Sequence, residues 1–175
     1  MKDIQEEGNI SVNSLNSLNP MRYDLEAIVD SSEPISEYLK ASEEETTKFS
    51  ERRAEYKLNG DAVEGIRAKV GDVVVVVFSA EWCPDCFRNV PVLGLLNEET
   101  GLEVRVFGHL KRNIMTPDER WAIPPSPPEV KEFNVIKIPL ITVLNRDGEK
   151  LGEIVENPPK GQTLETALLE ILKGA

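Results

Sequence analysis

Cys83 and Cys86 are the residues whose type and spacing point most directly to chemistry, and they are the two cysteines of the chain. A disulfide framework needs more cysteines, and a closed zinc site needs four ligands where this chain offers two cysteines and His109. In a chain expected to be cytoplasmic, the C-x-x-C spacing favours reversible thiol–disulfide exchange by the cysteine pair itself. We therefore expect neither a metal nor a separate cofactor.

The segment after the first cysteine predicts how the pair would work. Disulfide exchange needs a thiolate, and the N-terminus of a helix stabilises negative charge. We expect a helix from Cys83 to about Asn97, so Cys83 would attack and Cys86, one turn on, would resolve the mixed disulfide. Pro84 lacks an N–H, which costs little in a first turn. The nearby charge of Asp85 predicts a higher Cys83 pKa than a neutral residue would give.

The elements that would position this helix are predicted by the hydrophobic pattern from residue 71 onward. A continuous apolar run, typical of a strand buried on both faces, precedes the C-x-x-C helix. A right-handed βαβ unit is followed by a hairpin that turns at Asp147–Gly148 and by a last helix capped by Thr163. The predicted strands cover residues 73–78, 102–107, 139–144 and 150–156, and a short helix covers 129–133.

The chain before this domain is predicted to hold an arm and a helical extension. Residues 1–20 are rich in Asn and Ser, and we expect them to be flexible. Residues 21–70 are expected to be helical and to pack on the core. We expect three helices in this extension. The first follows Pro34, the second starts at a Ser42–Glu45 capping box and runs to about Leu58, and the third is capped by Asp61.

A proline-rich insertion at residues 111–128 is expected within the domain of residues 71–175. Trp121 lies in this insertion and could cover the site or pack under its own loop. His109 follows the second strand at the sheet edge where Cys83 lies, so it is a candidate proton acceptor with an ordinary pKa near neutrality. The simpler interpretation is an exposed loop histidine.

The composition excludes two classes of partner. There are 31 acidic and 20 basic residues, a net charge of −11, which would repel nucleic acid. The longest apolar run, residues 73–78, is far shorter than the ~20 residues that span a bilayer. The polar start, MKDIQEEGNI, offers no apolar stretch for a secretion signal, so we expect a cytoplasmic protein.

The stretch VVVVVFSAEWCPDCFRNVPVL, residues 73–93, resembles the active-site region of the thioredoxin superfamily. Trp82 opens a W-C-P-D-C string, Pro91 matches the kinking proline of that family, and Pro139 after Ile138 matches its cis-proline. The resemblance covers about residues 73 to 173. It implies an α/β thioredoxin fold, with a central mixed sheet of four to five strands and helices on both faces. The W-C-P-D-C form is similar to a branch, common in bacteria and archaea, with an N-terminal helical extension.

The resemblance also implies an activity. The chain would be a thiol–disulfide oxidoreductase of cell redox homeostasis, most simply a reductase of protein or small-molecule disulfides, with a thioredoxin reductase as electron donor. The redox-active centre would be the Cys83–Cys86 disulfide. Trp82 would form an apolar rim to the site, and the backbone of Ile138, beside Pro139, would pair with an extended substrate.

Three positions depart from the family pattern. The family's buried aspartate corresponds to Val77, its lysine partner to Val106, and its other active-site tryptophan to Ser79. Losing both buried charges together leaves neither one unpaired. It also removes the usual proton acceptor of the second cysteine.

Two other functions stay open from the sequence. The chain could be a binding module that keeps the fold without turnover, using its extension and acidic surface. Two chains could also share a metal or an iron–sulfur cluster through paired C-x-x-C motifs.

Overall fold

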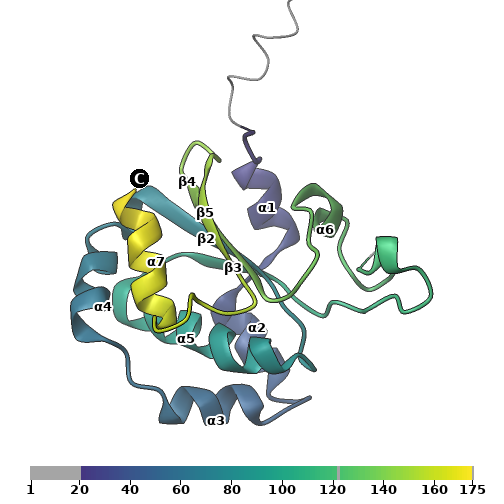
Figure 1. Ribbon diagram of the computed structural model, residues 1–175, viewed down its shortest axis with the longest axis horizontal. Coiled ribbons are helices and arrows are strands. Elements are labelled where there is room, and N and C mark those ends of the chain that lie inside the picture. The colour runs from purple at the N-terminus through teal and green to yellow at the C-terminus, as the bar shows by residue number, and fades with distance from the viewer. Residues whose placement is uncertain (1–20, 122, 175) are drawn as a thin grey trace, which may run out of the picture.

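A five-stranded mixed sheet forms the centre of the computed structural model, which describes residues 21–121 and 123–174. The strand order is β1-β3-β2-β4-β5 (Figure 1). The predicted α/β class and mixed sheet are confirmed, whereas the predicted arm, residues 1–20, lies outside the described residues. The strands are β1 (Glu33–Pro34), β2 (Val73–Phe78), β3 (Val104–Phe107), β4 (Leu140–Asn145) and β5 (Lys150–Val155).

The central strand β2 is buried along its whole length, as its apolar run predicted. It pairs in parallel with β3 and antiparallel with β4, and β4 continues into the hairpin partner β5. The hairpin turns at Asp147–Gly148, and Gly148 has a φ of 81°. A Cβ at Gly148 would also overlap the carbonyl of Tyr23, so this turn needs glycine.

Helices cover both faces of the sheet (Figure 1). Helices α5 (Pro84–Thr100) and α7 (Leu164–Lys173) pack together on one face. On the other face Phe133, at the end of α6 (Glu129–Glu132), stacks on Tyr23 and packs against Phe78 of β2. The predicted cap of the last helix is confirmed, because the Thr163 side chain accepts a hydrogen bond from the Thr166 N–H.

The extension contributes a strand as well as helices, so the expectation of an entirely helical segment was wrong. Strand β1 pairs antiparallel with β3, with Glu33 opposite Val106. Arg105 of β3 fastens this edge, since its guanidinium donates to the Ser32 side chain and to the Val29 carbonyl. Two residues are too few to produce a period-two pattern, so only the tertiary pairing reveals β1. The helices are α1 (Leu25–Ser31), α2 (Ile35–Ser42), α3 (Lys48–Glu55) and α4 (Gly60–Arg67).

Two predicted helix caps in the extension were wrong. Ser42 ends α2 instead of opening a helix, and its hydroxyl donates to the Tyr38 carbonyl at 2.7 Å. Helix α3 therefore starts at Lys48 and ends at Glu55, three residues before the predicted end. Helix α4 is capped by Asn59, whose side chain accepts from the Ala62 N–H at 3.0 Å, and not by Asp61. Cap residues are common in loops, so local spacing alone matched the wrong ones.

The proline-rich insertion forms a loop with a single turn of 3-10 helix, η4 (Pro117–Glu119). Pro125 follows Pro124 through a cis peptide bond. The Ser126 hydroxyl donates to the Lys111 carbonyl at 3.1 Å and accepts from the Lys111 N–H at 2.8 Å, which closes the base of the loop. In the described part of the chain, no helix is both long and apolar enough to cross a membrane.

Candidate active site

Cys83 occupies the N-cap position of α5, where the strand-to-helix turn presents unpaired backbone N–H groups. Its Sγ accepts a hydrogen bond from the Cys86 N–H at 3.4 Å. Pro84 lies at the first helical position, where its missing N–H costs nothing. Cys83 is 5% exposed and Cys86 is fully buried, so the first cysteine is the more accessible of the two.

The surroundings of Cys83 favour its thiolate. The hydrogen bond from the Cys86 thiol is the largest influence that lowers the pKa of Cys83 to about 7, against the opposing effect of burial. The backbone N–H groups of Cys86 and Asp85 lower this pKa further, whereas the negative charge of Asp85 raises it. The sign of the Asp85 effect is the one the sequence predicted. A thiol with a pKa near 7 is substantially ionised at neutral pH and is a competent nucleophile.

Cys86 has the opposite character. Burial raises its pKa, and so do the hydrogen bond that it donates to Cys83 and the charge of that neighbour. A backbone hydrogen bond at Ala80 and a side-chain hydrogen bond from Ser79 act in the other direction. Cys83 is therefore the more readily ionised of the two thiols, and Cys86 is the buried thiol that keeps its proton.

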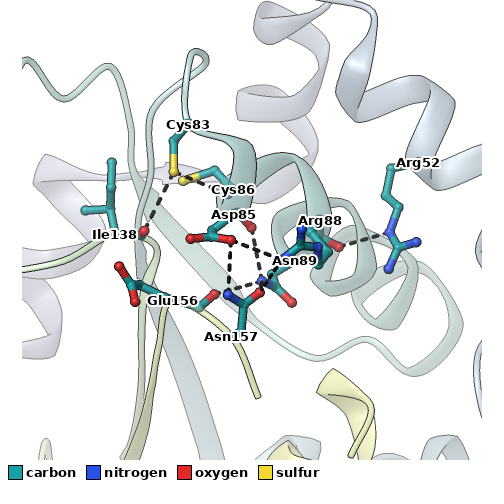
Figure 2. A network of polar contacts seen from close by, with 9 residues as sticks. All are labelled: Arg52, Cys83, Asp85, Cys86, Arg88, Asn89, Ile138, Glu156 and Asn157. Atoms are coloured by element: carbon teal, nitrogen blue, oxygen red, sulfur yellow. Dashed lines mark hydrogen bonds and ion pairs between the residues drawn. The ribbon is translucent and has the colours of Figure 1, made fainter. Parts of the chain in front are cut away.

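The segment before β4 meets the first cysteine from the other side. The Cys83 thiol donates to the Ile138 carbonyl at 3.6 Å, and the peptide bond between Ile138 and Pro139 is cis (Figure 2). The sequence matched this proline to the family's cis-proline. The pairing of Ile138 with an extended substrate stays a prediction.

Val77 and Val106, where the family carries buried charges, lie opposite each other in the β2–β3 ladder. Both side chains are buried. An apolar pair therefore occupies these two neighbouring strand positions, in line with the two valines noted in the sequence.

A polar network fixes Asp85 on the outer side of the helix (Figure 2). Asp85 Oδ1 accepts from Arg88 Nη1 at 3.1 Å and from Asn157 Nδ2 at 3.0 Å. The side-chain oxygen Oδ1 of Asn157 in turn accepts from Arg88 and from Asn89, at 3.1 and 2.9 Å. Asn89 also donates to the backbone carbonyl of Glu156 at 2.8 Å. The loop after β5 is therefore tied to the first turn of α5, an arrangement that sequence reasoning did not foresee.

Trp82 lies next to Cys83 in the chain and is 44% exposed, and its role as a rim of the site stays a prediction. Its indole N–H donates to the Leu110 carbonyl at 3.1 Å, and its ring stacks on Trp121 with 6.2 Å between centroids. Trp121 is buried and donates its own N–H to the Ile136 carbonyl at 3.0 Å. The insertion thus packs on the tryptophan of the motif and on the segment before Pro139.

His109 lies at the predicted sheet edge, half-exposed, with a φ of 61°. Its Nδ1 is 2.8 Å from Glu81 Oε1 and its Nε2 is 3.5 Å from Glu33 Oε1. These two carboxylates, and not Cys86, are the polar partners of the ring among the residues that the structure describes. A role as proton acceptor stays a prediction without a supporting contact.

Sequence reasoning missed two buried hydroxyls near the resolving cysteine. Tyr38 of α2 and Ser79, just after β2, are both fully buried, and their oxygens are 2.9 Å apart. The sequence singled out Ser79 only as the position where the family carries a tryptophan. A Ser three residues before Trp82 was the available signal, but its partner lies 41 residues away in the chain.

Metal binding within one chain finds no ready site. Among residues 21–121 and 123–174, no group of three or more His, Cys, Asp or Glu side chains is placed to hold a metal ion. The paired C-x-x-C arrangement considered above would need a second chain.

Comparisons with known proteins agree with this geometry. A family model described as thioredoxin matches residues 32–169. No curated protein matches the chain. Among solved structures, an HIV epitope scaffold has a TM-score of 0.62 at 19% identity, over 87% of this chain and 99% of the scaffold. A Pseudomonas aeruginosa protein of unknown function has a TM-score of 0.59 at 17% identity, over 84% of this chain and 93% of its own.

These two structural likenesses support the fold, and the family match spans both the sheet and the C-x-x-C turn. The chain belongs to the thioredoxin family.

Proposed function

We propose that the protein is a thiol–disulfide oxidoreductase that cycles Cys83 and Cys86 between dithiol and disulfide. One observation carries the proposal: Cys83 caps α5, accepts the Cys86 N–H at 3.4 Å and has a pKa of about 7. A buried structural cysteine has no reason to be ionised, whereas an attacking thiol needs to be.

The cycle follows from the division between the two sulfurs. The Cys83 thiolate attacks one sulfur of a substrate disulfide, and the other substrate sulfur leaves with the bonding electrons. Cys86 then attacks Cys83 Sγ, the second substrate sulfur leaves, and the Cys83–Cys86 disulfide forms. Two electrons pass from the protein to the substrate, and the substrate thiols take up the protons.

The direction that we favour is reduction of protein or small-molecule disulfides, in a reducing compartment such as the cytoplasm. A flavin-dependent thioredoxin reductase would return the electrons. The redox-active disulfide needs no further cofactor. The net charge of −11 argues against a nucleic-acid partner, and a disulfide substrate needs no membrane.

The test is the equilibrium of the cysteine pair against a series of reduced and oxidised glutathione, read by thiol alkylation and mass. We expect one two-electron transition at a potential below that of the cytosolic glutathione pool. A Cys83→Ser, Cys86→Ser variant is the blank for alkylation. A pair that stays reduced in oxidised buffer, or that changes only when metal is present, would contradict the proposal and favour metal binding.

The binding-module alternative predicts a different outcome from Cys83→Ser. If a partner binds this variant and the wild-type protein equally well, and neither protein exchanges disulfides, the function is binding and not turnover.

A further inference from the structure

Asn89 is a buried polar residue on a helix whose other buried residues are mostly apolar. It is 3% exposed, and its side-chain amide donates to three oxygens (Figure 2). One is the Asp85 carbonyl of its own helix, at 3.0 Å. The other two belong to the loop after β5: the Glu156 carbonyl at 2.8 Å and Asn157 Oδ1 at 2.9 Å. Because a buried amide needs its partners, Asn89 fixes this loop against α5.

Glu156 carries this hold across to the segment beside the first cysteine. Its N–H donates to the Pro139 carbonyl at 2.8 Å, and its Oε2 is 3.7 Å from Lys137 Nζ. Its φ is 63°, a conformation that is uncommon for a residue with a side chain and that the surroundings have to hold. The amide of Asn89 holds its carbonyl, and Pro139 holds its N–H.

These contacts form a closed ring that includes the attacking thiol. Cys83 caps α5, and Asn89 lies in the second turn of that helix. Asn89 bonds to Glu156, and Glu156 bonds to Pro139. Ile138, directly before Pro139, closes the ring, since its carbonyl accepts from the Cys83 thiol at 3.6 Å. A shift of the loop would therefore move the Ile138 backbone relative to the Cys83 sulfur.

We propose that Asn89 is a positioning residue for disulfides carried on extended peptides: it fixes the Ile138 backbone relative to the Cys83 sulfur. This inference rests on the proposed function and deepens it, because it names peptide disulfides as the preferred substrate class. A sulfur attacked by Cys83 brings its flanking residues beside Ile138, where backbone hydrogen bonds can add to the affinity. A small disulfide has no such flanks, so its reaction should not depend on the loop.

Two mixed disulfides with the same leaving group separate the two contributions. One is an octapeptide whose central cysteine is joined to thionitrobenzoate, and the other is N-acetylcysteine amide joined to the same group. In both, the Cys83 thiolate attacks the cysteine sulfur, the sulfur–sulfur bond breaks, and thionitrobenzoate leaves with the electron pair as a coloured thiolate. The ratio of the two rates isolates the contribution of the flanking residues, because a change in the pKa of Cys83 would affect both reactions alike.

Asn89→Leu keeps the approximate size of the side chain and removes its donors. We expect the wild-type protein to react faster with the peptide than with the small disulfide. In Asn89→Leu the ratio of these rates should fall by about three- to tenfold, the factor expected for one hydrogen bond. The loss should appear as a higher peptide concentration at half-saturation, with little change in the limiting rate, because a contact that binds the substrate is weakened.

Two further variants complete the test. Asn157→Ala changes a partly exposed loop residue and leaves the bond from Asn89 to the Glu156 carbonyl, so it should lower the ratio by less. Asn97→Leu is the matched control, because Asn97 also lies on α5 but donates to the Leu102 carbonyl, at 2.8 Å, near the other end of the helix. It should leave the ratio as in the wild-type protein.

The failures are distinguishable. A folded Asn89→Leu protein with the wild-type ratio overturns this inference and leaves the proposed function intact, and so does a wild-type protein that shows no preference for the peptide. If Asn89→Leu does not fold, an Asn157→Ala protein with the wild-type ratio has the same meaning. An equal fall in Asn97→Leu would assign the effect to general loosening of α5. A wild-type protein that releases no coloured thiolate from either substrate contradicts the proposed function itself.

Discussion

On its outer side the first turn of α5 carries charged groups, whereas its inner side meets hydroxyls and apolar side chains. The outer group is Asp85, bonded to Arg88 and Asn157 (Figure 2). It is partly exposed, and Arg88 is more exposed still. Water and the guanidinium both reduce the cost of keeping a carboxylate near the Cys83 thiolate.

On the inner side, neither water nor a guanidinium lowers the cost of a charge. Cys86, Ser79 and Tyr38 are fully buried, and so is the Val77–Val106 pair beneath them. A charge here would lose its hydration without a partner, which costs several kcal/mol. Hydroxyls can still donate to a sulfur without that cost.

The two sides of this one helical turn therefore place Cys83 and Cys86 in different surroundings. The side that meets water can tune the attacking sulfur with charges, because these charges are screened. The side that faces the core surrounds Cys86 with buried hydroxyls and apolar side chains instead of screened charges. Substitutions on each side should therefore have different effects, the strongest at the cysteines themselves.

Single serine substitutions should separate the two sulfurs most completely. Cys83→Ser should abolish the release of thiol from a disulfide substrate, because the remaining Cys86 is buried and protonated. Cys86→Ser should keep the first attack and accumulate the mixed disulfide on Cys83, visible by intact mass. Accumulation of the mixed disulfide on Cys86 in the Cys83→Ser protein would contradict this division of labour.

Gly108→Ala should damage the inner side through packing. The added Cβ would lie within 2.6 Å of Tyr38 Cδ2, and an aromatic ring cannot bend away. We expect the free energy of unfolding in urea to fall by about 1–3 kcal/mol, as for an overpacked core. Gly60→Ala is the control, since a Cβ there meets nothing within 4 Å. Equal stabilities of the two variants would mean that Tyr38 is not tightly held.

The two pKa shifts predict how the stability of the reduced protein changes with pH. Between about pH 7 and 9 the folded Cys83 has lost its proton and the unfolded one has not, so the free energy of unfolding should rise. Above pH 9 the unfolded chain releases a proton that the folded Cys86 keeps, so it should fall again.

The comparison is made with the Cys83→Ser, Cys86→Ser protein, which removes both thiols. The difference in the free energy of unfolding should peak near pH 9, at about 1 kcal/mol above its value at pH 7. Urea titrations across this range, with both thiols kept reduced, measure it. A difference that stays flat would show that the two thiols do not differ in the folded state.

Asp85→Asn should have the smallest effect, on the outer side alone. Removing the charge should lower the Cys83 pKa by about half a unit, because the site is partly open to water. The absorbance of the thiolate against pH measures it. Arg88→Gln should raise the same pKa while Asp85 is present, and should do so less in the Asp85→Asn protein. A Cys83 pKa that does not fall in Asp85→Asn would show that its charge is already fully screened.

Long patterns in the sequence predicted the core of the fold. The apolar run of β2, the C-x-x-C helix and the Asp147–Gly148 turn lie where they were expected. Each has a local physical cause: continuous burial, a helix start after a strand, and a glycine at positive φ. The extension was predicted less well, because several of its loop residues could have served as caps.

The composition of the site was visible in the sequence, and much of its surroundings was not. The W-C-P-D-C string identified the two thiols, and their order along a helix assigned attack to Cys83 and resolution to Cys86. Nothing local linked Asp85 to Asn157, which lies 72 residues on, or Ser79 to Tyr38, 41 residues before. Contacts between distant segments depend on how the helices pack, and no periodicity records them.

Local sequence patterns therefore predicted the cysteine pair, the helix that carries it and the strands that hold that helix. What surrounds each sulfur depends on tertiary contacts. The reason is that a helix N-terminus and a hydrophobic period are properties of neighbouring residues, whereas the burial of Cys86 and the contact between Tyr38 and Ser79 involve segments that only folding brings together.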